Sequence, residues 1–130
     1  MPIFLIALGG ALGALARYGI GQYMANHLSS GRLHFATLAV NLLGCFLIGL
    51  LYRLSQSSDL LHINLRPLVF VGLLGGFTTF STFGLEMLNL LRDHGPAPAV
   101  TYILASVLGG LALTYLGYIL ANSFAPPIAG

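Results

Sequence analysis

The residues best suited to chemistry lie in one run of hydroxyl and phenyl side chains, GLLGGFTTFSTFGLEM at residues 72–87. Phe80 and Phe83 stand three residues apart, with Ser81 and Thr82 between them. Residues three apart share a helix face, and the edge of an aromatic ring carries a positive partial charge. Ring edges beside hydroxyl donors therefore make a surface that attracts an anion without a fixed charge. Packing or contact with lipid is the alternative role of such phenylalanines, and their spacing leaves it open.

Two other apolar segments carry polar side chains at helical spacing. Thr37 and Asn41 are one turn apart, and the amide of Asn41 supplies two donors near the centre of its segment. A second stripe repeats every four residues, with Gly110 at the missing step: Tyr102, Ser106, Thr114 and Tyr118. Polar residues at membrane depth usually face a bundle interior or a wet cavity. Hydrogen bonding between helices is the competing interpretation.

The glycines of the first run predict an interruption of a helix. Gly75 and Gly76 are followed by two threonines, glycine is about 1 kcal/mol worse than alanine inside a helix, and threonine competes for backbone hydrogen bonds. We expect a helix to about Leu74, an unwound turn, and a second helix from about Thr79. Such interruptions free carbonyl oxygens and build ion sites. Carbonyls from two subunits meeting on a two-fold axis would suit a small cation, whereas a simple packing kink would bind nothing.

The composition indicates whether these elements fold in water or in a membrane. The chain has 57% hydrophobic and 6% charged residues, with a mean hydropathy of +0.91, whereas soluble domains carry about 25% charged residues. We therefore predict an integral membrane protein, and five arginines are too few for a nucleic-acid surface. The predicted spans contain no central Asp, Lys or His, so neither a proton relay nor a metal cage is expected. The histidines fall in loops or at span ends, where solvation is the simplest interpretation: His27, His34, His62 and His94.

The charged residues and prolines delimit four apolar segments. The predicted spans cover residues 2–24, 33–52, 66–91 and 98–122. Each has roughly the 20 residues that a helix needs to cross about 30 Å of hydrocarbon, and a helix pairs all of its own backbone polar groups. The expected fold is an all-α membrane protein with one domain over residues 1–130, and its first segment is interpreted as a retained span rather than a signal peptide.

The arginines show almost no bias between the two sides of the membrane. Arg53 and Arg66 lie on the side of both termini, whereas Arg32, Arg92 and the nearer Arg17 belong to the other side. Orientation follows the Lys/Arg bias of short loops, so insertion in both orientations is expected. The corresponding assembly is an antiparallel two-fold dimer. Pairs such as Gly9 and Gly13 could serve its contacts, but equally the packing within one subunit.

Three segments together resemble the CrcB/Fluc family of fluoride ion channels. They are GGALGALARYGIG at 9–21, TLAVNLLGCFLIG at 37–49 and GLLGGFTTFSTFGLE at 72–86. The resemblance implies a channel rather than an enzyme: a four-helix protein that forms antiparallel, dual-topology homodimers in the bacterial inner membrane. It also implies passive export of cytoplasmic fluoride, and hence fluoride resistance. Without the resemblance, the residues themselves indicate a path for a small anion but do not identify the anion.

The resemblance also implies roles for individual residues. Asn41 matches the family's pore asparagine, and Phe80 and Phe83 match its fluoride-contacting phenylalanines. Gly75 and Thr78 match the backbone carbonyls that hold a structural sodium ion. Arg17 matches an arginine near the aqueous vestibule. The remaining residues of the expected fluoride path carry hydroxyl groups: Thr37, Ser81, Thr82 and Ser106. Where the family has a second hydroxyl on the fourth span, this chain has Gly110, with Thr114 one turn on.

Two functions of other kinds compete with a channel. Proton-coupled exporters of the small multidrug type are also four-helix proteins of this length, but they need a carboxylate in the middle of the membrane. This chain offers only Glu86, expected near the end of a span. A purely structural membrane subunit is the third possibility, and it leaves the polar stripes unexplained.

Overall fold

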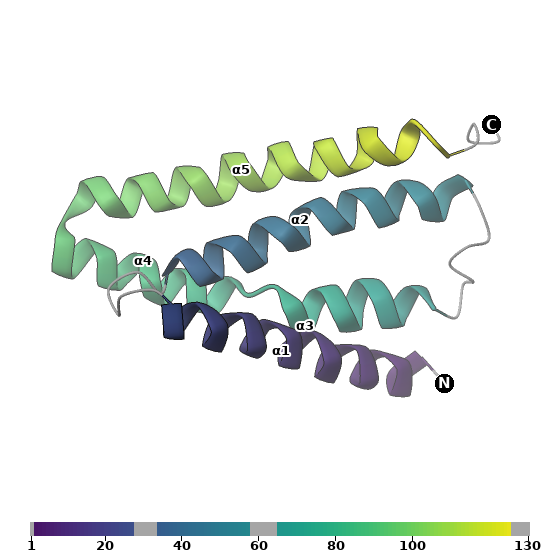
Figure 1. Ribbon diagram of the computed structural model, residues 1–130, viewed down its shortest axis with the longest axis horizontal. Coiled ribbons are helices and arrows are strands. Elements are labelled where there is room, and N and C mark those ends of the chain that lie inside the picture. The colour runs from purple at the N-terminus through teal and green to yellow at the C-terminus, as the bar shows by residue number, and fades with distance from the viewer. Residues whose placement is uncertain (1, 28–33, 58–64, 126–130) are drawn as a thin grey trace.

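The computed structural model describes residues 2–27, 34–57 and 65–125, and these form four long apolar helical spans that run side by side (Figure 1). The helices are α1 (Pro2–His27), α2 (His34–Ser57), η2 (Pro67–Leu74), α3 (Gly75–Phe77), α4 (Phe80–His94) and α5 (Pro96–Asn122). Each span is long and apolar enough to cross a membrane, so the protein is a multi-pass membrane protein. Arg32 of the topology argument lies outside the described residues.

The spans extend beyond the ends predicted from the charged residues. Helix α2 continues past Arg53 to Ser57, and α4 continues to His94 rather than ending near residue 91. Arg53 fits inside α2 because its Nε donates to Asn122 Oδ1 at 2.7 Å, and the side chain is buried. Gly95, with φ of 87°, adopts the left-handed region that glycine tolerates. It turns the chain from α4 into α5, which begins at Pro96, two residues before the predicted start of the fourth span.

The third span consists of η2, α3 and α4, and it leaves the helix at two residues only. Thr78 (φ −85°, ψ 157°) and Thr79 (φ −148°, ψ 123°) are extended, and Figure 1 shows a short thread between α3 and α4. The axis bends by only 18°. The first helix was predicted to end at about Leu74, but Gly75 to Phe77 are also helical. The second helix begins at Phe80, one residue after its predicted start at about Thr79.

Close packing against α1 explains why the glycines stay helical. A Cβ atom on Gly76 would lie 2.6 Å from the carbonyl oxygen of Gly10, and one on Gly72 would lie 2.9 Å from the Cα of Gly9. Added side chains on Gly9 and Gly13 would meet the backbone of the third span. The glycines thus bring two backbones together, as small residues do between membrane helices. For Gly9 and Gly13, this is the intrasubunit role left open by the sequence.

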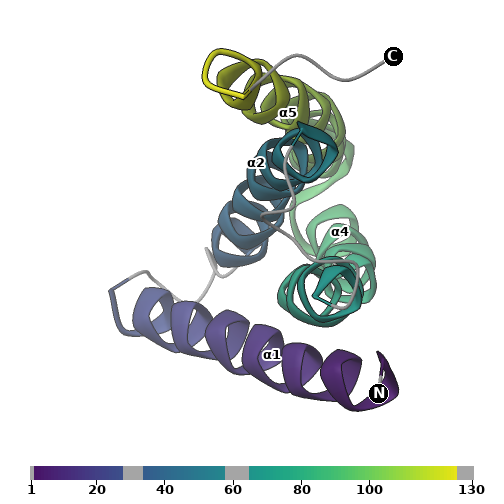
Figure 2. The ribbon, with the colours of Figure 1, turned by 90° about the vertical axis from the view of Figure 1, so that its right-hand side faces the viewer.

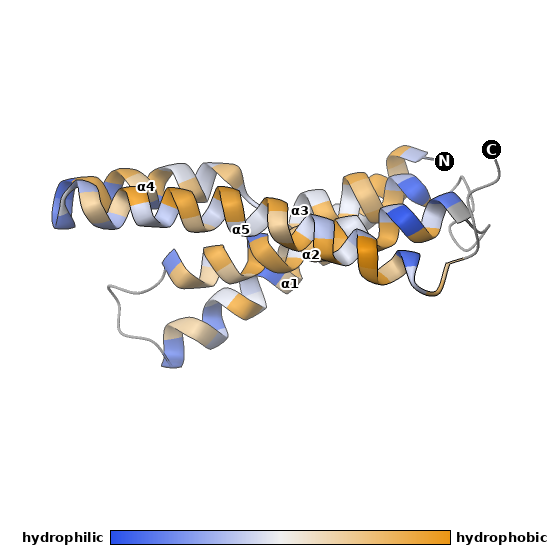
Figure 3. Cartoon of the chain, turned by 90° about the horizontal axis from the view of Figure 1, so that it is seen from above, coloured by the Kyte–Doolittle hydropathy of each residue, from blue (hydrophilic) through white to orange (hydrophobic). Residues whose placement is uncertain are grey.

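Helices α2 and α5 form the other closely packed pair. Seen end-on, they lie together, the third span lies next to them, and α1 runs along the opposite edge (Figure 2). A Cβ atom added to Gly117 would meet the backbone of Phe46, and one added to Gly49 would meet the backbone of Thr114. Hydrophilic residues gather near the ends of the spans, while their lengths are mostly apolar (Figure 3). Many large apolar side chains are exposed in the single chain, as expected for surfaces that face lipid or another subunit.

Candidate functional site

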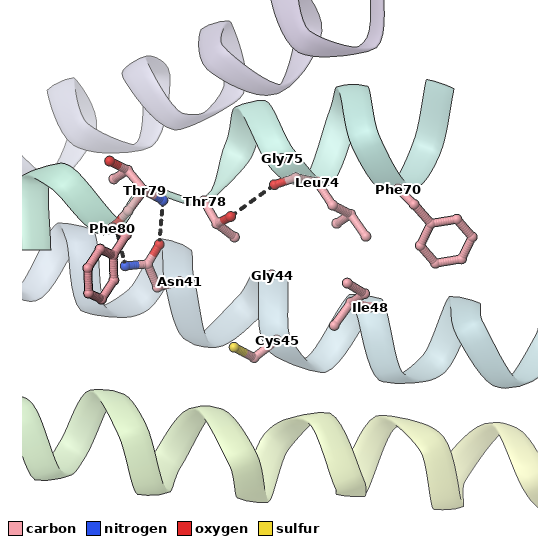
Figure 4. A pocket seen from close by; sticks show the side chains of 10 residues that line it. All are labelled: Asn41, Gly44, Cys45, Ile48, Phe70, Leu74, Gly75, Thr78, Thr79 and Phe80. Carbon is pink, nitrogen blue, oxygen red and sulfur yellow. Dashed lines mark hydrogen bonds between the residues drawn. The ribbon is translucent and has the colours of Figure 1, made fainter. Parts of the chain in front are cut away.

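The side chain of Asn41 on α2 holds the extended part of the third span. Its Nδ2 donates to the carbonyl oxygen of Thr79 at 3.0 Å, and the Thr79 N–H donates to Oδ1 at 2.8 Å (Figure 4). One amide group therefore pairs with both backbone groups of a residue that no longer belongs to a helix. An amide nitrogen has two N–H donors, so one donor remains beyond the bond to Thr79.

The hydroxyl of Thr79 begins the next helix. Thr79 Oγ1 accepts from the N–H of Thr82 at 3.3 Å and donates to Thr82 Oγ1 at 3.1 Å, which is the geometry of an N-cap. Ser81 Oγ lies 3.4 Å from the same oxygen. Thr79, Ser81 and Thr82 thus form a group of hydroxyls at the start of α4.

These contacts take two N–H donors away from their regular carbonyl partners. In an unbroken helix, the N–H of Thr79 would pair with the carbonyl of Gly75, and that of Thr82 with the carbonyl of Thr78. They donate instead to Asn41 and to the Thr79 hydroxyl. Gly75 and Thr78 are the two residues expected to offer carbonyls to a cation. Neutral oxygen donors of this kind suit a hard monovalent cation, so the donor set fits sodium.

Several expected site residues line one open pocket of about 330 Å³ between α2 and the third span (Figure 4). Asn41 lies at one end, and the pocket follows the third span past Thr78 toward Phe70. The complete lining is Asn41, Gly44, Cys45, Ile48, Phe70, Leu74, Gly75, Thr78, Thr79 and Phe80. The structure therefore brings Asn41, Phe80 and the two expected carbonyl residues to one place.

Arg17 reaches the third span from α1. Its Nε donates to the carbonyl oxygen of Gly76 at 3.2 Å. It also lines a second pocket of about 180 Å³, together with Thr37, Thr79 and Thr82. The arginine expected at a vestibule thus shares a polar pocket with three hydroxyl residues, and its guanidinium is the positive charge of that pocket.

The two phenylalanines occupy different surroundings. The ring centroids of Phe80 and Phe83 are 5.5 Å apart at an interplanar angle of 39°. Phe80 is 84% exposed. Phe83 packs against the cluster of Leu90, Ala99 and Tyr102, and its ring centroid lies 5.2 Å from that of Tyr102. One ring is therefore anchored within the chain, whereas the other projects away from it.

Glu86 lies at the centre of a hydrogen-bonded group that the sequence did not predict. Thr37 Oγ1 donates to Glu86 Oε1 at 2.8 Å, and the Tyr102 hydroxyl donates to Oε2 at 2.7 Å. Because α4 continues to His94, Glu86 lies about two helical turns before the end of the third span, somewhat further from that end than the predicted span to residue 91 implied. In the sequence, a sign of this group is that Glu86 follows Phe83 by three residues and therefore shares its helix face. Its partners on α2 and α5 are distant in sequence.

The stripe on α5 divides into two parts. Tyr102 bonds Glu86, whereas Ser106 Oγ donates to the Tyr102 carbonyl at 2.7 Å and Thr114 Oγ1 donates to the Gly110 carbonyl at 2.9 Å. Both short hydroxyls therefore bond their own helix, as threonine and serine commonly do. The phenol end of the stripe is joined to the residues around Asn41 through Phe83 and Glu86, and Ser106 is bonded to Tyr102 one turn further along α5.

Comparison with known proteins places this arrangement in a family. The family model described as CrcB-like protein, Camphor Resistance (CrcB), matches residues 4–118. The chain belongs to the CrcB family. The match spans most of the chain and includes every expected site residue, from Arg17 to Ser106.

Curated relatives of this CrcB protein carry one recurrent name, "Fluoride-specific ion channel FluC". A protein of Thermus thermophilus is 46% identical over 119 residues, covering 92% of each chain. One of Chloroflexus aurantiacus is 44% identical over 122 residues, covering 94% of this chain and 96% of the relative. One of Methylobacillus flagellatus is 42% identical over 116 residues, covering 89% and 91%. The relatives are thus similar over nearly their whole lengths, and their name describes a channel rather than an enzyme.

Proposed function

We propose that this CrcB protein is a fluoride-selective ion channel through which fluoride leaves the cytoplasm passively. The observation that carries the proposal is the full-length similarity to proteins named as fluoride-specific ion channels. The site agrees with that function, since Asn41 and the hydroxyls of Thr79, Ser81 and Thr82 gather beside the ring of Phe80. A proton-coupled exporter is not favoured, because the relatives are named as channels.

Uncharged donors suit rapid passage of an anion. Conduction requires binding that is favourable enough for entry and weak enough for release. Fluoride is a small, strong hydrogen-bond acceptor, so amide and hydroxyl donors partly replace its water, and ring edges add weaker attraction. The proposed path begins beside Arg17 at the vestibule. It includes Thr37, Asn41, Phe80, Ser81, Thr82, Phe83 and Ser106.

A second copy of the chain completes the path. Phe80 is almost fully exposed, and the pocket next to it is open along the third span. A large apolar side chain at the edge of a polar site is typical of a surface that another subunit covers. The weak arginine bias supports an antiparallel homodimer assembled from chains of both orientations. We place it in the bacterial inner membrane.

A structural sodium ion fits the two-fold axis of this dimer. The carbonyls of Gly75 and Thr78 lose their regular N–H partners to Asn41 and Thr79, so two such oxygens from each subunit would surround one cation. A bound monovalent cation would be attracted to the negative ends of these carbonyl dipoles. It would thereby join the third span of one subunit to the third span of the other. In this proposal Thr78 and Thr79 interrupt the helix, and the carbonyls of Gly75 and Thr78 beside the interruption hold the ion.

The physiology follows from the chemistry of hydrogen fluoride. The neutral acid crosses membranes and ionises inside, so fluoride accumulates when the exterior is acidic. The negative interior then drives the anion out along a selective path without any coupled energy source. Expression of such a channel would give fluoride resistance.

Ion flux from liposomes tests the proposed function. The purified protein is reconstituted, a potassium gradient with a potassium ionophore sets the voltage, and fluoride or chloride release is recorded with ion-selective electrodes. We expect rapid fluoride release and chloride release no faster than from protein-free liposomes. Release of both anions at similar rates, or of neither, would contradict a fluoride-selective channel.

A further inference from the structure

A second open groove lies between α2, α5 and the first part of the third span, and the proposed fluoride path uses none of its residues. Its volume is about 470 Å³, within the range of about 300–1,000 Å³ that is usual for ligand sites. The groove adjoins the pocket beside Asn41, because Ile48 and Phe70, at the far end of that pocket from Asn41 (Figure 4), line both. Its lining is Ile48, Gly49, Tyr52, Phe70, Leu111, Thr114, Tyr115 and Tyr118.

The surface of the groove is aliphatic and aromatic. Within it, α2 and α5 approach each other so closely that a Cβ atom added to Gly49 would meet the backbone of Thr114. The hydroxyl of Thr114 donates to the Gly110 carbonyl at 2.9 Å, so its hydrogen is already used. Leu111 and Tyr115 are exposed in the single chain. The groove therefore offers apolar contact to an occupant.

Tyrosines place the groove near one surface of the membrane. Three of the six tyrosines of the chain line it: Tyr52, Tyr115 and Tyr118. Tyr52 and Tyr118 lie in the last two turns of α2 and α5, which end at the same end of the bundle (Figure 1). Tyrosine is enriched where the membrane meets water. The groove thus lies at the depth at which acyl chains join their headgroups.

Arg66 stands at the outer end of the groove. It comes four residues, about one helical turn, before Phe70, and its Nη2 donates to the carbonyl oxygen of Ser55 at 2.7 Å. Ser55 follows Tyr52 by three residues and bonds its carbonyl. A guanidinium has five N–H donors, and the bond to Ser55 uses one. An exposed positive charge therefore lies about one turn beyond two of the rings that line the groove.

The charge at this end of the bundle is positive. Arg53 and Arg66 lie here, whereas both described carboxylates, Glu86 and Asp93, belong to α4 toward the opposite end (Figure 1). The one acidic residue between the two arginines in the sequence is Asp59, which lies outside the described residues. Two arginines and one aspartate leave a net charge of +1 on that segment. The charge of this end thus complements an anionic headgroup.

We propose that the groove binds an acyl chain of an anionic phospholipid, whose phosphate is held by Arg66. Basic pockets between membrane helices recognise anionic headgroups, and the planar fork of an arginine matches phosphate oxygens. The apolar groove alone would accept any acyl chain, and the arginine supplies the selection for a negative headgroup. A second copy fits this groove less well, because the proposed two-fold axis lies at Gly75 and Thr78, beyond Ile48 and Phe70 and deeper in the membrane.

Quenching by brominated lipids tests the proposal. The chain has no tryptophan, so one introduced tryptophan reports on the lipid beside it. Tyr115→Trp places the reporter in the groove. Phe4→Trp, at an exposed position on α1 near the same end of the bundle (Figure 1), is the matched control. Each protein is reconstituted in phosphatidylcholine liposomes with increasing fractions of phosphatidylglycerol or phosphatidylcholine that carries bromine on its acyl chains.

For Tyr115→Trp we expect half-quenching at a mole fraction about threefold to tenfold lower for brominated phosphatidylglycerol than for brominated phosphatidylcholine, the preference expected of one arginine near the membrane surface. For Phe4→Trp the two lipids should quench equally. Arg66→Gln in the Tyr115→Trp protein should remove the preference. Arg92→Gln, which removes an exposed arginine at the opposite end, should keep it.

Three outcomes would overturn the proposal. Equal quenching of Tyr115→Trp by both lipids would make the groove an ordinary lipid-facing surface. Quenching of Tyr115→Trp by both lipids far weaker than that of Phe4→Trp would show that a second copy covers the groove. A preference that persists in Arg66→Gln would exclude the arginine. If that variant does not fold, as judged by gel filtration, a preference that persists in high salt, which screens exposed charges, overturns the proposal instead. No step uses fluoride, so the result is independent of the proposed channel.

Discussion

Asn41 pairs with both backbone groups of Thr79, donating to its carbonyl at 3.0 Å and accepting from its N–H at 2.8 Å. The two residues are 38 positions apart. A buried backbone N–H or C=O without a partner is strongly unfavourable, and in lipid no water can supply one. The amide of Asn41 therefore allows two extended residues to exist at membrane depth. It also places a remaining amide donor beside the pocket that Phe80 lines.

Asn41→Asp should reduce fluoride release by about tenfold or more, a change of about 1.4 kcal/mol or more in the barrier. The aspartate still accepts from the Thr79 N–H, but it cannot donate to the Thr79 carbonyl, and its charge repels the anion. Ion-selective electrode recordings on liposomes measure the effect, with gel filtration as the check on folding. Leu43→Ile, at an exposed position on α2, is the control. A folded Asn41→Asp that conducts at the parent rate would place the path elsewhere.

Phe80→Ile should also reduce fluoride release strongly, while the fold of each chain is kept. Phe80 is 84% exposed and so contributes little to packing within its own chain, and isoleucine removes the ring edges while keeping a large apolar side chain. Phe4→Ile, at a position 70% exposed on α1, is the matched control for loss of a surface ring. Equal release from both variants and the parent would show that Phe80 only packs or faces lipid.

Gly75→Ala tests the proposed sodium site. A Cβ atom there would meet nothing closer than the Phe70 carbonyl at 3.9 Å, so the chain should fold, but the methyl group would enter the pocket where the partner's carbonyls are expected. We expect lower fluoride release and a weaker dependence of dimer stability on sodium, measured by cross-linking in sodium and in a larger organic cation. Gly84→Ala, which would contact nothing within 4 Å, is the control. Identical sodium dependence in all three proteins would argue against the site.

Much of the fold was predictable from composition and local spacing. The four long apolar segments give the four spans, and the predicted start of the fourth at residue 98 lies two residues from the observed start of α5 at Pro96. Asn41 could be recognised as a residue of unusual importance, because an amide in the middle of an apolar span needs a partner. These predictions depend on short-range sequence alone.

The remaining features depend on contacts between distant segments. Gly75 and Gly76 suggested an unwound turn, yet they stay helical because the backbone of Gly10 approaches Gly76 closely. The extended residues lie further on, at Thr78 and Thr79, where Asn41 can pair with the backbone. The partners of Glu86 are on α2 and α5. Spacing along one helix cannot reveal which neighbouring helix supplies a partner.

The C-terminus should be found on both sides of the membrane. The few arginines give little bias, so reporters of cytoplasmic and periplasmic location fused to the C-terminus should both give signal at normal expression. Gln56→Arg, at an exposed position near the end of α2, adds one positive charge on the side of the termini and should shift the signal toward the cytoplasm. A parent protein with signal from one side only would exclude dual topology.

Glu86→Gln separates a channel from a proton-coupled exporter. An exporter would use the carboxylate to carry the proton, so its transport would be lost in the variant and would require a pH gradient in the parent. In the channel, Glu86 mainly accepts hydrogen bonds from Thr37 and Tyr102. Glutamine keeps an acceptor for one of them, so we expect the free energy of unfolding to fall by about 1 kcal/mol while passive fluoride release persists. The measurement is release at equal pH and under an imposed pH gradient, with thermal unfolding of the same samples. Transport that occurs only with the gradient, and that disappears in Glu86→Gln, would replace the channel with an exporter.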